Sequence, residues 1–263
     1  MARRKRRTPL SLSKNRVSKT RVSKTRVSTA GVYVAATIAG LCLIGAASLW
    51  FGWWSLNSVR ARAYPVWGLD VSHHQGRIDW RAVASEPRIR FAYVKATEGD
   101  DWSDNTFSAN FRNAKNAGLA VGAYHFFSFC SDPFAQVAHF LKTAPPERDS
   151  LAPMVDVELG GACRAMGSDS EVRARLRRFL VLLEKSTGRR PVIYATNEAY
   201  DRFVKDYGLP NPLWLRDIWH EPASVAGQEW QIWQFANRGH VKGVRGYVDL
   251  NVLAGGEAAL VRL

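Results

Sequence analysis

Cysteine is scarce in this sequence, with three residues, and acidic side chains are absent before Asp70. Glycine and proline, with 20 and 11 of 263 residues, occur at ordinary levels, and 46% of the residues are hydrophobic. This composition excludes a collagen-like or disordered chain and suits one ordinary globular domain with some additional length. The net charge of +14 suggests a nucleic-acid binder only until the charges are located along the chain.

The first 26 residues contain eleven basic side chains and no acidic one. Without those eleven, 26 basic residues remain against 23 acidic ones, so the rest of the chain carries only about +3. A pentad that begins at Arg16 recurs at Arg21 and, imperfectly, at Arg26. Because such a low-complexity repeat has too little apolar surface to bury a core, we expect residues 1–30 to form a disordered basic tail.

No charged side chain occurs from Val27 to Val59. About 20 apolar residues suffice to cross roughly 30 Å of hydrocarbon, so we predict a transmembrane helix at residues 31–56. Tryptophans, which favour the headgroup layer, cluster at its far end: Trp50, Trp53 and Trp54. The positive-inside rule then places the N-terminus in the bacterial cytoplasm and everything after residue 60 outside. Orientation and anionic lipid account for the basic tail, so no nucleic-acid partner is expected.

Two alternatives to a membrane anchor exist for the apolar segment. A buried core helix of this length would normally show a polar face. A cleaved signal peptide is consistent with Ala61-Arg62-Ala63, which fits a processing site and would release the domain near Ala63, although the apolar run exceeds the usual 7 to 15 residues. In both the anchored and the cleaved case the globular part is exported. We expect a linker at residues 57–64 and a globular domain at residues 65–263.

Short apolar runs that indicate buried strands alternate with helical patterns in the globular part. The expected strands are 66–71, 91–96, 120–127, 152–159, 191–196, 213–216, 230–235 and 248–253. The expected helices are 104–117, 133–142, 171–186 and 197–207, and Ser168 with Glu171 forms a capping box before the third of them.

Strands joined by helical crossovers indicate a parallel sheet, and eight of them indicate a closed barrel. The last third departs from this plan, because residues 217–229 and 236–247 are short, glycine-containing connections without helical periodicity. The predicted fold class is therefore α/β, with an irregular TIM-like barrel of five β/α units followed by three plain strands, preceded by a single transmembrane helix.

Acidic side chains stand where the predicted strands end. Asp156 and Glu158 lie two residues apart on one strand, so both point to the same face. In a barrel of this type that position is the C-terminal mouth, where catalytic groups usually lie. A carboxylate in an apolar strand is costly unless something compensates it. A purely structural role for the pair is the alternative to a functional one.

Further polar residues are expected to converge on this rim. Asp70 ends the first strand and Asp249 lies in the last, and these two strands are neighbours in a closed barrel. Crowded carboxylates raise at least one pKa, which keeps an acid protonated for general acid catalysis. Paired acids with aromatic walls suit glycoside cleavage. Either Asp70 or Asp249 alone would equally serve to brace a loop. The same rim is expected to receive Tyr124, His125, Trp233 and Gln234.

Several ordered motifs at these positions resemble those of glycoside hydrolase family 25, the Chalaropsis-type lysozymes or N-acetylmuramidases. They are Asp70-Val-Ser-His-His-Gln75-Gly76, Tyr93-Val-Lys95-Ala-Thr97-Glu98-Gly99, Gly122-Ala-Tyr124-His125-Phe126, Asp156-Val-Glu158, Trp233-Gln234 and Asp249-Leu-Asn251. The resemblance runs from about Pro65 to the C-terminus and leaves out the tail and the apolar segment.

This resemblance implies a (β/α)5(β)3 barrel that hydrolyses the β-1,4 bond between N-acetylmuramic acid and N-acetylglucosamine in peptidoglycan glycan strands. Glu158 would be the general acid, Asp156 would assist through the substrate N-acetyl group, and Asp70 and Asp249 would complete the acidic cluster. The residues expected to contact sugar are Tyr124, His125, Tyr194, Trp214, Trp233, Gln234 and Asn251. For any single tryptophan, core packing is the alternative.

Cysteine and histidine bear on the remaining expectations. Cys130 and Cys163 follow neighbouring strands, so in an oxidising compartment we predict a disulfide between them, against two free thiols. Cys42 lies in the apolar segment.

His73, His74 and His125 lie beside acids, but no compact metal-ligand motif occurs, so neither metal nor cofactor is expected. We expect a monomeric catalytic domain. The alternatives are a catalytically weak peptidoglycan-binding module and a metal-dependent polysaccharide deacetylase.

Overall fold

The computed structural model describes residues 29–52, 57–161, 163, 165–223 and 229–263. The chain divides into two compact units, residues 1–44 and 45–263. The expected basic tail lies almost wholly outside the described residues, as do Trp53 and Trp54.

The apolar segment forms helix α1, Thr29–Trp50, which matches the predicted transmembrane helix except at its ends. Its 22 residues have a mean hydropathy of 2.0, and it is the one helix in the described part of the chain that is long and apolar enough to cross a membrane. None of its residues is buried within the protein, so it lacks the surroundings of a core helix.

The rest of the chain forms a closed barrel of eight strands, to which a short ninth strand, β3, is added as a hairpin on β2. Its strands are β1 (Trp67–Val71), β2 (Ile89–Glu98), β3 (Trp102–Ser103), β4 (Ala120–Phe126), β5 (Met154–Val157), β6 (Val192–Thr196), β7 (Leu213–Arg216), β8 (Trp230–Gly239) and β9 (Val248–Leu253). The helices are α2 (Ser58–Ala61), η1 (His73–Gln75), α3 (Trp80–Ala84), α4 (Phe107–Asn116), α5 (Pro133–Thr143), α6 (Asp169–Thr187), α7 (Asn197–Ala199), η2 (Tyr200–Val204) and α8 (Glu257–Leu260).

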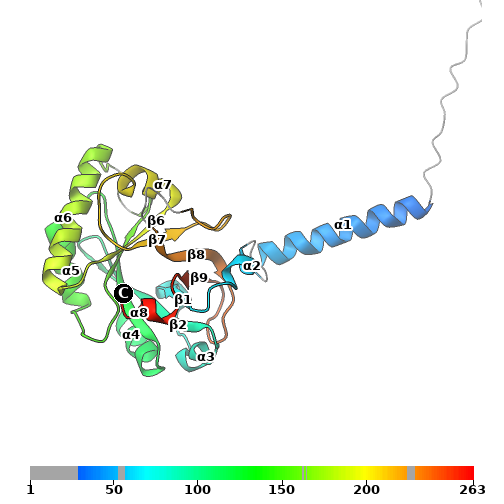
Figure 1. Ribbon diagram of the computed structural model, residues 1–263, viewed down its shortest axis with the longest axis horizontal. Coiled ribbons are helices and arrows are strands. Elements are labelled where there is room, and N and C mark those ends of the chain that lie inside the picture. The colour runs from blue at the N-terminus through cyan, green and yellow to red at the C-terminus, as the bar shows by residue number, and fades with distance from the viewer. Residues whose placement is uncertain (1–28, 53–56, 162, 164, 224–228) are drawn as a thin grey trace, which may run out of the picture. The chain divides into compact units, whose positions relative to one another are not determined.

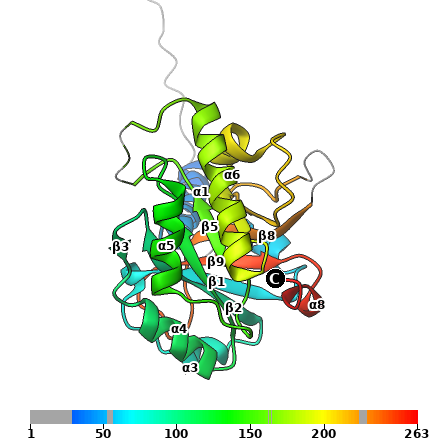
Figure 2. The same ribbon diagram turned by 90° about the vertical axis from the view of Figure 1, so that its left-hand side faces the viewer.

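The five β/α units and three plain strands predicted from the sequence are confirmed. Figure 2 shows α5 and α6 side by side on the outside of the barrel, a pairing that their contacts bear out. The predicted capping box of α6 is present, because the Ser168 side chain accepts from the N–H of Glu171 while the Glu171 side chain accepts from the N–H of Ser168. Gly188 ends this helix in the left-handed conformation, with φ of 69°.

One barrel strand runs antiparallel to its neighbours. Strands β1, β2, β4, β5, β6, β7 and β8 are parallel, whereas β9 is antiparallel to both of its neighbours, β8 and β1. Figure 1 shows β9 between these two strands. A short connection such as residues 240–247 can join only antiparallel neighbours, because a parallel strand needs a crossover of a dozen or more residues.

The expected linker is partly folded onto the barrel. Asn57 and Ala61 have no exposed surface, and the Asn57 side chain donates to the backbone oxygen of Asp217. The ring of Tyr64 lies 5.4 Å from that of Trp230. Residues from Asn57 onward therefore belong to the packed domain.

The barrel interior is filled by large side chains that require glycine opposite them. A Cβ on Gly122 of β4 would lie 2.2 Å from the Tyr93 ring. That ring is fully buried and its hydroxyl donates to the Ala152 backbone oxygen, so it cannot move aside. Gly122 thus lets the interior close around Tyr93.

We expect Gly122→Ala to lower the free energy of unfolding of the barrel by about 1–3 kcal/mol, because overpacking forces side chains off their rotamers. Calorimetry of Tm measures the effect. Gly160→Ala is the matched control, since a Cβ there meets no atom within 4 Å. Equal stability of the two variants would show that the interior has room to adjust.

Candidate active site

The acidic side chains meet at the end of the barrel where the parallel strands finish. Asp70 on β1 and Asp249 on β9 are direct partners across the strand pair. Asp249 is the second residue of β9, and it reaches this end only because β9 is antiparallel. The predicted neighbourhood of Asp70 and Asp249 is therefore present, through a strand direction that the sequence pattern did not predict.

Amide side chains on neighbouring strands hold these two carboxylates. Asn251 donates from Nδ2 to Oδ1 of Asp70 at 2.7 Å, and Gln234 donates from Nε2 to Oδ1 of Asp249 at 2.7 Å. The indole N–H of Trp214 donates to Oδ1 of Asn251 at 3.0 Å, which sets the orientation of that amide. Asn251, Gln234 and Trp214 thus position the acids from below the mouth.

Asp156 and Glu158 occupy the end of β5 as predicted. Asp156 is buried, and its Oδ1 has no hydrogen-bond partner in the described part of the chain. Glu158 follows the strand and is half-buried. A buried acceptor without a donor is costly in an isolated protein. The site therefore offers an acceptor that a bound N–H or O–H group can use.

The shared environment raises the pKa values of Asp70, Asp156 and Asp249. Burial, reinforced by the charge of Glu158, raises the pKa of Asp70 to about 6, although the hydrogen bond from Asn251 opposes the shift. Burial is also the largest cause that raises the pKa of Asp156 and of Asp249 well above the usual range, with Glu158 next for Asp156 and Asp70 next for Asp249. The cluster therefore retains protons at pH values where isolated aspartates have lost them.

Aromatic side chains form the floor beneath the acids. Tyr194 on β6 and Trp214 on β7 meet edge to face at 5.5 Å, and Tyr124 on β4 is also buried at this level. Burial raises the pKa of both tyrosines well above the usual value, so their hydroxyls stay protonated. Trp214 has no exposed surface, and its ring supports the site from within the barrel.

Two of the predicted sugar-contacting residues lie on the outer face of the barrel. His125 is fully buried, its Nδ1 pairs with Thr97 Oγ1 at 2.8 Å, and its Nε2 pairs with Gln136 Oε1 at 3.0 Å. Burial lowers the pKa of His125 to about 4. The Trp233 indole N–H donates to the Asp217 backbone oxygen at 2.8 Å.

The period of two along a strand explains both positions. Tyr124 and Gln234 point into the barrel, so their chain neighbours His125 and Trp233 point out. This corrects the expectation that they join the acids at the rim, and the alternation was available in the sequence.

Charged residues that the sequence reasoning left out complete the mouth. Lys95, on the inward face of β2, contacts Glu98 through a 2.7 Å ion pair. Lys95 opposes the raised pKa of Asp156, and Arg216, two residues after Trp214 on β7, opposes those of Asp70 and Asp249. Their spacing of two from Tyr93 and Trp214 was the signal that placed them on the inward face.

The predicted disulfide joins Cys130 to Cys163, with a Cα–Cα distance of 5.5 Å. It links the loop after β4 to the loop after β5, the loop that also carries Glu158. The described residues contain no group of three or more His, Cys, Asp or Glu side chains that could hold a metal ion, so their geometry gives no support to the metal-dependent alternative.

A closed barrel with a cluster of acids at the end where its parallel strands finish is the arrangement of a barrel-type glycosidase, and comparison with known proteins gives the family. The family model for glycosyl hydrolases family 25 matches residues 69–244. An uncharacterized protein of Escherichia coli O157:H7, YegX, is 37% identical over 202 residues, which span 75% of this chain and 73% of YegX. Lysozyme M1 of Streptomyces globisporus is 34% identical, over 75% of this chain and 71% of the lysozyme.

Solved structures of similar proteins indicate the same family. A family 25 glycosyl hydrolase from Bacillus anthracis superposes with a TM-score of 0.70 at 37% identity, over 74% of this chain and 92% of that one. A bacterial lysozyme from Streptomyces coelicolor superposes with a TM-score of 0.68 at 34% identity, over 74% and 95%. The chain belongs to glycosyl hydrolase family 25. It is a glycoside hydrolase.

We expect Asp70→Asn to make the domain more stable than the natural protein, by an amount that increases as the pH rises. Because the folded state raises the pKa of Asp70 from 3.8 to about 6, folding retains a proton that the unfolded chain releases. Stability of the natural protein therefore falls between pH 4 and pH 6, by up to about 3 kcal/mol for this group. Asparagine removes that loss and keeps the acceptor for Asn251.

Thermal unfolding of both proteins at pH 4 and pH 7 measures the difference. The Tm advantage of Asp70→Asn should be small at pH 4 and largest at pH 7. The exposed Asp101→Asn is the control. An advantage that did not change with pH would contradict the raised pKa.

Proposed function

We propose that this protein is a membrane-anchored muramidase that hydrolyses the β-1,4 bond between N-acetylmuramic acid and N-acetylglucosamine in peptidoglycan. The observation that carries the proposal is the buried Asp156 beside the half-buried Glu158 at the mouth of a family 25 barrel. The relatives named as lysozymes and an N,O-diacetylmuramidase of Arthroderma benhamiae support this substrate.

Glu158 is the proposed general acid. Its side chain is half-buried, so it can reach a glycosidic oxygen that enters from solvent. The departing sugar oxygen takes the proton from Glu158 as the bond to the anomeric carbon breaks, and the carboxylate that results then activates water.

Asp156 is the proposed partner of the substrate N-acetyl group. Its Oδ1 lacks a donor in the described structure, and the N–H of an acetamido group would supply one. Held in this way, the acetamido oxygen can approach the anomeric carbon as positive charge develops there. Asp70, whose pKa is raised only to about 6, is ionised at neutral pH and supplies negative potential next to that charge. Asn251 holds Asp70, and Gln234 holds the neighbouring Asp249.

We expect Glu158→Gln to reduce turnover of purified peptidoglycan by about 10²–10⁴-fold, because glutamine cannot donate the proton. Mass spectrometry of products with reducing-end muramic acid measures the reaction. The surface substitution Glu184→Gln on α6 is the control and should leave turnover unchanged.

Other outcomes separate the alternatives. Equal turnover by Glu158→Gln would contradict the assigned acid. Muropeptide binding by the natural protein without release of reducing ends would indicate a binding module. Loss of acetyl groups in a reaction that a chelator abolishes would indicate a metal-dependent deacetylase.

The membrane topology follows from α1 and its flanking charges. Eleven cations precede the helix, and the only basic residues between it and the barrel are Arg60 and Arg62. We propose that the tail is cytoplasmic and that the barrel lies outside. The packing of Asn57 and Ala61 onto the barrel supports an anchor over cleavage near Ala63, because the processing motif is part of the folded domain.

We expect opposite labelling of two engineered cysteines in a Cys42→Ala background. In intact cells with a permeable outer envelope, a membrane-impermeant maleimide should label Ser58→Cys but not Ser11→Cys, and permeabilisation should expose the second. The mass of the labelled protein reports cleavage. Labelling of Ser11→Cys in intact cells, or a mature chain that begins at Tyr64, would contradict an anchor with this orientation.

A further inference from the structure

A second hollow lies on the outside of the barrel, away from the acids. It has a volume of about 780 Å³ and opens between α4, α5 and the loop of residues 144–153. We call it the α4–α5 pocket. Its strand residue is Ala123, which points outward, whereas the next residue, Tyr124, points into the barrel beside the acids. The α4–α5 pocket therefore shares no residue with the candidate active site.

The helical layer is incomplete at this point. On the outer face of β4, Val121 and His125 are fully buried, whereas Ala123 between them is only half-buried. Three rings form the wall of the gap: Phe107 and Phe111 from α4 and Phe140 from α5. Phe111 also remains half-buried. Phe107 and Phe140 are buried in the wall, so the pocket leaves partly accessible apolar surface at Ala123 and Phe111.

The rim of the pocket is positively charged. Arg112 and Arg148 line it and form no ion pair within the described residues, whereas Lys115 is neutralised by Glu147 and Asp149. The Lys115 bridges attach the loop to α4, so the rim is held in place before any ligand arrives. The two arginines without an ion pair therefore favour an anionic ligand.

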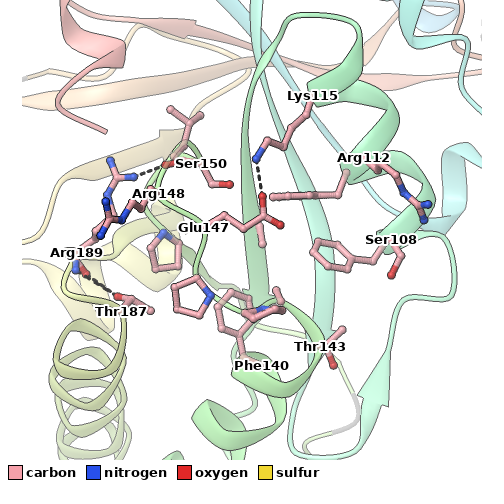
Figure 3. A pocket seen from close by; sticks show the side chains of 18 of the residues that line it. Ser108, Arg112, Lys115, Phe140, Thr143, Glu147, Arg148, Ser150, Thr187 and Arg189 are labelled. Atoms are coloured by element: carbon pink, nitrogen blue, oxygen red, sulfur yellow. Dashed lines mark hydrogen bonds and ion pairs between the residues drawn. The ribbon is translucent and has the colours of Figure 1, made fainter.

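One end of the pocket carries a donor without an acceptor. Figure 3 shows Ser150, Arg148 and Arg189 at this end, with Arg112 and Ser108 at the other. Ser150 Oγ is buried and has no hydrogen-bond partner in the described structure. Arg189 donates from its guanidinium to the Ser150 backbone oxygen, and its other guanidinium N–H groups have no acceptor among the described residues.

We propose that the α4–α5 pocket binds an anionic amphiphile. Its acidic headgroup would accept from Arg148, Arg189 and Ser150 Oγ, while its apolar chain or ring would lie on Phe107, Phe111 and Phe140. The volume is in the range of pockets that take small molecules. A fatty acid and an anionic phospholipid share this chemistry.

Photo-crosslinking of the full chain in phosphatidylcholine nanodiscs tests the proposal. One arm uses palmitate with a diazirine on its chain, and the second uses phosphatidylglycerol with the same acyl chain. The methyl ester of the palmitate probe is the uncharged control. Mass spectrometry locates the labelled residues. We expect label on residues 107–116 and 140–153 from at least one anionic probe, about tenfold above the ester.

Two variants and a matched control complete the experiment. Arg148→Glu removes an exposed cation, and Ala123→Leu fills the floor, so each should reduce pocket label about tenfold. Arg81→Glu, an exposed charge reversal on α3, should label like the natural protein. Near-ultraviolet circular dichroism confirms that the variants are folded.

The two anionic arms distinguish the source. Label from palmitate alone identifies a free acid, and label from phosphatidylglycerol identifies a membrane lipid. Equal labelling by the ester, labelling that both pocket variants leave unchanged, or no label from either anionic probe would overturn the proposal.

Discussion

The antiparallel insertion of β9 between β8 and β1 is the constraint on which the acidic cluster depends. It closes the barrel, and it carries Asp249 and Asn251 to the end where the parallel strands finish. Asp70 then faces Asp249 directly, and Asn251 reaches Asp70. If β9 ran parallel, the same residues would lie toward the opposite end of the barrel. The last three strands, which lack helices between them, thus close the barrel and also position acidic and amide side chains of the site.

Closure has an electrostatic consequence. Several carboxyl groups lose hydration on folding, and interactions in the folded state compensate only part of the hydration free energy that is lost. Gln234 and Asn251 donate to two of the acids, and Lys95 and Arg216 supply opposing charge. Among the described residues, one oxygen of Asp156 has no donor. Sites arranged for chemistry commonly retain such destabilising groups, because the substrate supplies the missing interaction.

The inner and outer faces of each strand serve different purposes, and the alternation decides which residue does which. On β4, Tyr124 forms part of the floor of the site and His125 stacks on Phe179 of α6 at 5.0 Å. On β8, Gln234 holds Asp249 and Trp233 packs near Phe235 at 5.9 Å. In each pair, both residues lie in the same family motif, so the motif alone does not tell which of them faces the site. The strand period separates them.

The sequence by itself determined the eight barrel strands, the main helices and the candidate acids, but it gave no sign of α3 or β3. Local patterns sufficed for the eight strands, the capping box of α6 and the apolar helix, because these depend on residues close together in the chain. Asp156 and Glu158 were found because two carboxylates in an apolar strand conflict with burial. Tertiary structure alone decided the direction of β9, the role of Arg216, the packing of Asn57 onto the barrel and the gap over Ala123. Each depends on contacts between segments far apart in the chain, and such contacts leave no periodic signal in either segment.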